Sequence, residues 1–167
     1  MSNIRVGYSG LIAVTISIIS IFTALIFTLI LTRNLSAEGF GTWGIIIGLI
    51  TYGMIVEPTV SFWTTRETAR GVEVGKTSLI SSILFSSFAM LIYFISAYFV
   101  GNSDDVNQEI LFVGIILMPI IFVNKSLFAL VIGWKPQLSS YSLLLVELTK
   151  IPLALVFLYF LEMGIFG

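Results

Sequence analysis

The sequence predicts an all-α membrane protein, a bundle of about five transmembrane helices. Of its 167 residues, 57% are hydrophobic and only 10% are charged, whereas soluble domains carry about 25% charged residues. The charges fall mostly between long apolar stretches, each at or above the roughly 20 residues that cross a bilayer. A water-soluble core of this size could not bury so much apolar surface, so the solvent is lipid.

Missing residue types exclude several kinds of chemistry. The chain has no cysteine and no histidine, so thiolate catalysis, cysteine or histidine metal sites and histidine bases are ruled out. A net charge of −1 gives no basic field for nucleic acid. Because no nucleophile–base pair or cofactor motif is visible either, we expect a non-catalytic protein without cofactor, metal or nucleic-acid partner.

The charged and polar breaks define five spans within one expected transmembrane domain, residues 1–167. The predicted helices cover about 8–32, 42–63, 78–100, 110–132 and 141–161. The segment 64–77 is the most charged break, and 101–109 holds acidic residues without Lys or Arg. The break at 133–137 predicts a tight turn, because Pro136 biases Lys135 away from helix.

Orientation follows from the bias of Lys and Arg towards cytoplasmic loops. A cytoplasmic N-terminus places five basic residues inside and only Arg33 outside; the five are Arg5, Arg66, Arg70, Lys76 and Lys135. We therefore expect a multi-pass protein of the cell membrane with its N-terminus in the cytoplasm. Segment 65–76 can continue as a surface helix in which Arg70 meets Glu73. Its Arg66, Arg70 and Lys76 either contact anionic lipid headgroups or only set the topology.

Four ionisable residues lie inside the predicted spans, and they are the candidate binding residues: Glu57, Lys125, Glu147 and Lys150. Charges at such depth normally face a bundle interior or a water-filled cavity. All four fall in the central-to-cytoplasmic half, and Glu57 and Lys125 each lie roughly 6 Å past the middle of their spans. Glu147 and Lys150 share a helix face at i,i+3. Glu57 and Lys125 can pair if the second and fourth helices touch. A substrate cavity, purely structural pairing and, for the lysines, snorkelling towards the membrane surface all remain open.

Small residues and prolines predict local packing and kinks. Pro58, Pro119 and Pro152 each fall inside a span, where they are expected to kink the helix. A kink beside a charge suits a moving helix that lines a cavity, and plain packing is the alternative. Serines at 81, 82, 86 and 87 give the third span a polar side that is expected to pack against a neighbour. Gly44 and Gly48 form a G-x-x-x-G pattern, which permits close helix approach.

Three short motifs carry a family resemblance. Residues 31–43 read LTRNLSAEGFGTW, with Arg-x-Leu, a small–acidic pair and an aromatic–Gly pair. Residues 62–70 read FWTTRETAR, which is similar to an Arg-x-x-Ala-Arg segment, and residues 163–167 read MGIFG, similar to a Gly-x-x-Gly link. The chain thereby resembles the polysaccharide flippases of the MATE-like multidrug/oligosaccharidyl-lipid/polysaccharide superfamily. Where that family often has Asp/Asn-Phe-Gly-Leu, this chain has Val56-Glu57-Pro58-Thr59. Whether Glu57 corresponds to any residue of the family therefore stays open.

The resemblance implies a larger transporter of about twelve or more helices in two lobes that move by alternating access. This chain would be most of the N-terminal six-helix lobe, and residues 162–167 would lead into a further helix or towards a partner chain. Substrates in the family are isoprenoid-pyrophosphate-linked oligosaccharides, and a cavity cation such as Lys125 or Lys150 suits a pyrophosphate. Two alternatives remain: a multidrug or organic-cation exporter of the same superfamily, and a small accessory membrane subunit.

Overall fold

The computed structural model describes residues 6–103 and 108–160. These residues form helices and no strand. Five of the helical stretches are long and apolar enough to cross a membrane. The predicted fold class, an all-α membrane bundle with about five spans, is therefore confirmed. Predictions that involve Arg5, Asp104, Asp105 or residues 161–167 lie outside the described residues.

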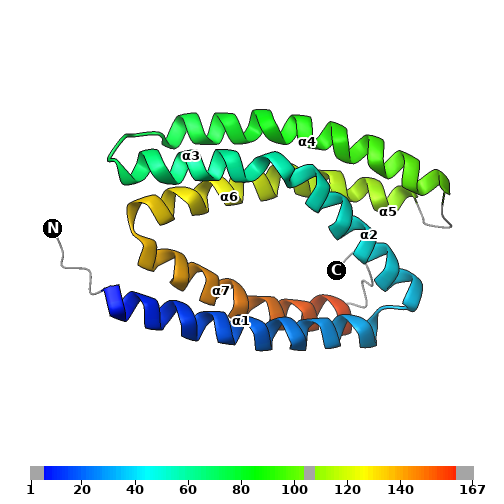
Figure 1. Ribbon diagram of the computed structural model, residues 1–167. Helices are drawn as coiled ribbons and strands as arrows, with labels where there is room; N and C mark the ends of the chain where they lie inside the picture. Colours follow the sequence, from blue (N-terminus) through cyan, green and yellow to red (C-terminus); the bar gives the residue numbers. More distant parts are fainter. Residues whose placement is uncertain (1–5, 104–107, 161–167) are drawn as a thin grey trace. The chain divides into compact units, whose positions relative to one another are not determined.

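The five spans follow one another along the chain (Figure 1). The first is α1 (Val6–Asn34), and the third is α4 (Gly75–Ser103). The other three are broken: α2 (Ala37–Gly53), η1 (Met54–Val56) and α3 (Glu57–Ala69); α5 (Gln108–Val113), η2 (Gly114–Ile116) and α6 (Leu117–Trp134); α7 (Pro136–Ala154) and η3 (Leu155–Phe160). The helices extend beyond the predicted spans because charges mark where the chain leaves lipid, whereas helical hydrogen bonding continues into the polar ends.

Two of the three intramembrane prolines lie one turn after a break in helix geometry. Pro58 follows the 3₁₀ segment η1, and Pro119 follows the 3₁₀ segment η2. A proline lacks the N–H that would bond to the carbonyl four residues earlier, and its ring crowds that carbonyl. The break therefore appears N-terminal to the proline. Pro152 behaves differently, because α7 continues through it and the wider π-helical η3 follows.

The helices form two compact units. The first contains α1, α7 and η3, with α1 lying alongside α7 (Figure 1). Partly or fully buried residues recur every three or four positions on both helices: Ile16, Ser20, Thr23, Phe27 and Leu31 on α1, and Leu144, Glu147, Ile151, Ala154 and Leu158 on α7 and η3. The other side of α1 exposes large apolar residues such as Phe22 and Leu25. Lipid, rather than water, accounts for such a surface.

The second unit holds residues 41–135, and α4 packs there against both α3 and α6. One stripe of α4 is buried: Ser78, Ser82, Ser86, Ala89, Tyr93 and Ala97. The predicted serine side is thus confirmed for Ser82 and Ser86, whereas Ser87 is exposed. The Tyr93 hydroxyl donates a 2.9 Å hydrogen bond to the carbonyl of Leu111. Leu49, Ile50, Met118 and Phe122 complete the apolar core around it.

Three hydroxyls join three helices of this unit. Ser78 of α4 bonds to Thr64 of α3, with 2.7 Å between the oxygens, and also to Ser126 of α6. All three side chains are almost completely buried. Such interhelical hydrogen bonds hold helices together where apolar surface gives no preference for protein over lipid.

Close packing of α3 and α6 depends on Gly133. A Cβ on this residue would lie 2.6 Å from the Thr65 carbonyl oxygen, and the Thr65 hydroxyl bonds to the Ala129 carbonyl of the same helix pair. Gly44 and Gly48, by contrast, have nothing within 4 Å of a built Cβ. The predicted G-x-x-x-G pattern therefore makes no close contact in the described structure.

Two turns show how local sequence ends the helices. Gly71 has φ +80°, and the N–H groups of Gly71 and Val72 bond back to the carbonyls of Thr68 and Glu67. This Schellman arrangement closes α3. The predicted surface helix over 65–76 is therefore wrong beyond Ala69, because Gly71 takes a left-handed conformation there. At the other turn, Lys135 is extended (φ −146°, ψ 92°), as the following Pro136 predicts.

Replacing the central hydroxyl tests the three-helix junction. Ser78→Ala leaves Thr64 and Ser126 buried without their shared partner, which costs about 1–3 kcal/mol. We expect a lower thermal midpoint in detergent. Ser87→Ala is the matched control, since its hydroxyl bonds only within α4. Equal midpoints for the two variants would contradict the junction's role.

Adding one methyl group tests the α3–α6 contact. Gly133→Ala drives a Cβ into the Thr65 carbonyl, and overpacking of this kind costs about 1–3 kcal/mol. Gly48→Ala adds the same methyl where space is open and improves helix propensity by about 1 kcal/mol. In thermal unfolding we expect the first variant to be destabilised and the second to be neutral or stabilised. A neutral Gly133→Ala would refute the close approach.

Candidate functional site

The buried carboxylate of Glu147 lies at the α1–α7 seam. Its two oxygens accept hydrogen bonds from two α1 hydroxyls, Ser20 at 2.7 Å and Thr23. Ser20 and Thr23 are three residues apart, so they lie on one face of α1. The carboxylate thus ties the two helices of this unit together through charge-assisted bonds, which are stronger than neutral ones.

Lys150 supplies the positive charge at this position. Its ammonium forms an ion pair with Glu147, the partner predicted from their i,i+3 spacing. The Lys150 side chain is 24% exposed and that of Glu147 is 7% exposed. The pair is therefore neutral in sum, and both carboxylate oxygens of Glu147 are bonded within the protein. This arrangement stabilises two charges that would each be costly in hydrocarbon.

Glu57 takes a different position, at the start of α3 just after the 3₁₀ break. Its side chain is buried and accepts a hydrogen bond from Ser61, one turn further along the same helix. The backbone N–H of Glu57 bonds to the Met54 carbonyl, and the next residue, Pro58, has no N–H. In the described part of the chain, the side-chain partner of Glu57 is thus the Ser61 hydroxyl and not a cation.

Lys125 is exposed on α6. The second and fourth spans do touch, because α3 packs against α6. The predicted Glu57–Lys125 pair is nevertheless wrong: among the described residues, the ion pairs include neither of them. The helix rotation explains this result, since α6 turns Met118, Phe122 and Ser126 into the core and leaves Lys125 outside. Lys125 thus remains a cation without an ion-pair partner in the described structure.

The three basic candidates of the charged break lie at the α3–α4 turn. Arg70 pairs with Glu67 at 3.0 Å, and Arg66 approaches the same carboxylate at 4.0 Å. The predicted contact of Arg70 with Glu73 is therefore wrong, because the Schellman turn ends the helix between them. Lys76 is exposed in the first turn of α4. These residues form a surface that carries three cations and two carboxylates.

Sequence reasoning missed the hydroxyl partners of Glu147. The sequence shows Ser20 and Thr23 on one face of α1, but the same helix also carries Thr15, Ser17, Thr28 and Thr32. What the sequence lacks is the identity of the helix that faces them. The same holds for Thr64, Ser78 and Ser126, which come from three different spans.

Comparison with protein-family models, curated proteins and solved structures finds no match to this chain.

Neutralising Glu147 tests the seam. Glu147→Gln leaves the Lys150 charge partly buried without its partner, and loss of one member of a buried pair costs about 3–5 kcal/mol. We expect a clearly lower thermal midpoint, and recovery of most of the loss when Lys150→Met is added. Thr149→Val is the control, because Thr149 is exposed on α7 and bonds within its own helix. If Glu147→Gln alone and Glu147→Gln with Lys150→Met were equally destabilised, the unpaired Lys150 charge would not be the cause of the lower thermal midpoint.

Proposed function

We propose that this chain is part of a transporter that moves isoprenoid-pyrophosphate-linked oligosaccharide across the cell membrane by alternating access. It would supply most of the N-terminal lobe, with the remaining lobe or a partner chain completing the protein. In this proposal the N-terminus is cytoplasmic, which puts the basic α3–α4 turn on the cytoplasmic side. The fold supports a membrane role, and the motifs at 31–43 and 62–70 support the flippase family.

The observation that carries the proposal is Lys125. It lies four residues past the middle of the span Gln108–Trp134, which is about 6 Å along the helix. The edge of the hydrocarbon is then about 9 Å further, given a half-thickness of about 15 Å. An exposed ammonium at that depth is costly in lipid, and such residues normally face a water-filled pathway. A pyrophosphate passing through that pathway would be the anion that Lys125 contacts.

The other three charges support the protein rather than the substrate in this proposal. Lys150 is already neutralised by Glu147, and Glu57 is held at the start of α3. Because Glu57 is buried and Lys125 is exposed, the accessible charge of the candidate group is positive, which favours a pyrophosphate over an organic cation. This is the observation that sets the flippase above the multidrug exporter.

Ligand binding by the purified chain in detergent tests the proposal. We expect farnesyl pyrophosphate to bind in preference to an organic dye cation. Lys125→Gln should weaken pyrophosphate binding roughly 10-fold or more, since a hydrogen bond to a charged group contributes about 1.5–3 kcal/mol. Lys125→Arg should retain most of it.

Lys135→Gln is the matched control, because Lys135 lies at the turn before α7, outside the spans, with its ammonium 4.4 Å from the centre of the Trp134 ring. It should bind as the parent chain does. Preference for the dye would favour the exporter. Absence of binding to either ligand, or equal losses for Lys125→Gln and Lys135→Gln, would contradict the role given to Lys125.

A further inference from the structure

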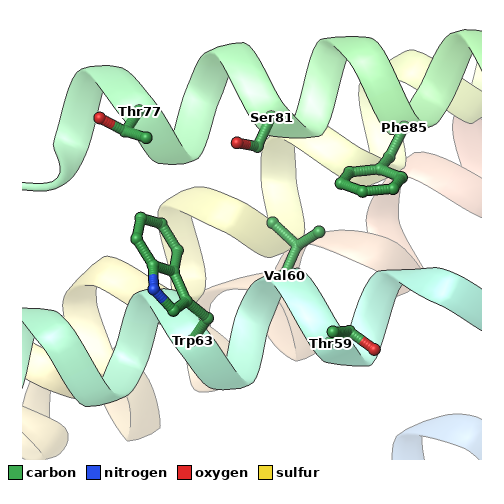
Figure 2. A pocket seen from close by; sticks show the side chains of 6 residues that line it. All are labelled: Thr59, Val60, Trp63, Thr77, Ser81 and Phe85. Carbon is green, nitrogen blue, oxygen red and sulfur yellow. The ribbon is translucent and has the colours of Figure 1, made fainter.

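A pocket of about 240 Å³ lies between α3 and α4, in the second unit (Figure 2). Six residues line it: Thr59, Val60, Trp63, Thr77, Ser81 and Phe85. Most of them are exposed at the helix surface, so the pocket is a groove that opens outward. It contains none of the four intramembrane charges and is therefore separate from the candidate residues discussed above.

The two ends of the groove lie at different depths along α3 and α4. Thr77 is the third residue of α4, close to the turn that joins α3 and α4, and Trp63 faces it from α3 (Figure 2). Phe85 lies eight residues further along α4, which is about 12 Å deeper into the span. The Ser81 hydroxyl lies between these ends. Each end pairs an aromatic ring with a threonine, Trp63 with Thr77 near the helix terminus and Phe85 with Thr59 deeper in the span (Figure 2).

Three cations and the carboxylates of Glu67 and Glu73 lie near the Thr77 end of the groove in the chain. Lys76 directly precedes Thr77 and is exposed, and Arg66 and Arg70 share the single carboxylate of Glu67 nearby in the chain. Basic residues at a helix end attract anionic lipid headgroups, and Trp is enriched at the level of the headgroups. A mostly apolar groove that begins next to exposed basic residues in the chain and runs about 12 Å into the span matches a phospholipid, with its headgroup at the Thr77 end and its acyl chain along the groove.

We propose that the α3–α4 groove is a binding site for an anionic phospholipid of the surrounding membrane. Its acyl chain lies against Trp63 and Phe85, and its phosphate lies at Lys76 and the Thr77 hydroxyl. The site follows from the membrane fold and the groove alone, so it does not depend on the transported substrate. Such a lipid would hold the α3–α4 hairpin at a fixed depth.

Quenching of Trp63 by lipids with brominated acyl chains tests this site. The parent for the test is Trp43→Phe, Trp134→Phe, which leaves Trp63 as its only tryptophan. We expect brominated phosphatidylglycerol to quench Trp63 at an at least threefold lower mole fraction than brominated phosphatidylcholine. Lys76→Gln should abolish that preference, and Ser81→Leu, which fills the groove, should weaken quenching by both lipids.

Matched controls separate the site from general lipid contact. Lys135→Gln removes a charge at another turn, and Ser87→Leu adds the same side chain to α4 outside the groove; both should behave as the parent. Equal quenching by the two lipids, or a preference that survives Lys76→Gln, would overturn the proposal. Two further results would overturn it. One is that farnesyl pyrophosphate displaces the brominated lipid at a lower mole fraction than phosphatidylglycerol does. The other is that quenching of Trp63 is lost when the chain dimerises. Lys76 is exposed, so the Lys76→Gln result decides the matter even if Ser81→Leu fails to fold.

Discussion

Lipid as solvent is the constraint on which the rest of this structure depends. Hydrocarbon offers no hydrogen bonds, so each polar group inside a span has to be satisfied by the protein itself. Glu147 meets this demand with two hydroxyls of α1 and the ammonium of Lys150. The hydroxyls of Thr64, Ser78 and Ser126 meet it by bonding to one another across three helices. Polar contacts therefore specify which helices pair, while the apolar faces of α1 and α4 remain exposed to lipid.

The broken spans follow from the same constraint. Pro58 and Pro119 each leave a carbonyl without its helical donor, and the chain tightens to 3₁₀ geometry one turn earlier. At the first break, a new α-helical segment begins with Glu57, whose buried carboxylate accepts a hydrogen bond from Ser61. The break and the charge are thus one local arrangement. A span made of two segments has a place where it can bend, which suits a transporter that changes its open side.

Local patterns in the sequence predicted the spans and the contacts within one helix. They could not predict the contacts between spans. The five spans follow from charge spacing, the Glu147–Lys150 pair from i,i+3 geometry, and the extended Lys135 from Pro136. The hydroxyl partners of Glu147 and the Thr64–Ser78–Ser126 junction depend on which helix faces which, and a single sequence does not contain that information. The Glu57–Lys125 pairing failed for the same reason, because the rotation of α6 about its axis decides where Lys125 lies. Arg70 was assigned the wrong partner because Gly71 ends α3 before Glu73 is reached.

Thiol labelling at position 125 tests the central claim, that Lys125 faces water inside the membrane, most directly. The chain has no cysteine, so Lys125→Cys creates a single reactive thiol, which reacts as the thiolate and therefore needs water. Leu127→Cys is the reference, because Leu127 is also exposed on α6 but is apolar. In lipid nanodiscs we predict that a water-soluble maleimide labels Lys125→Cys much faster than Leu127→Cys. Labelling of both at the same slow rate would place Lys125 against lipid and contradict the account.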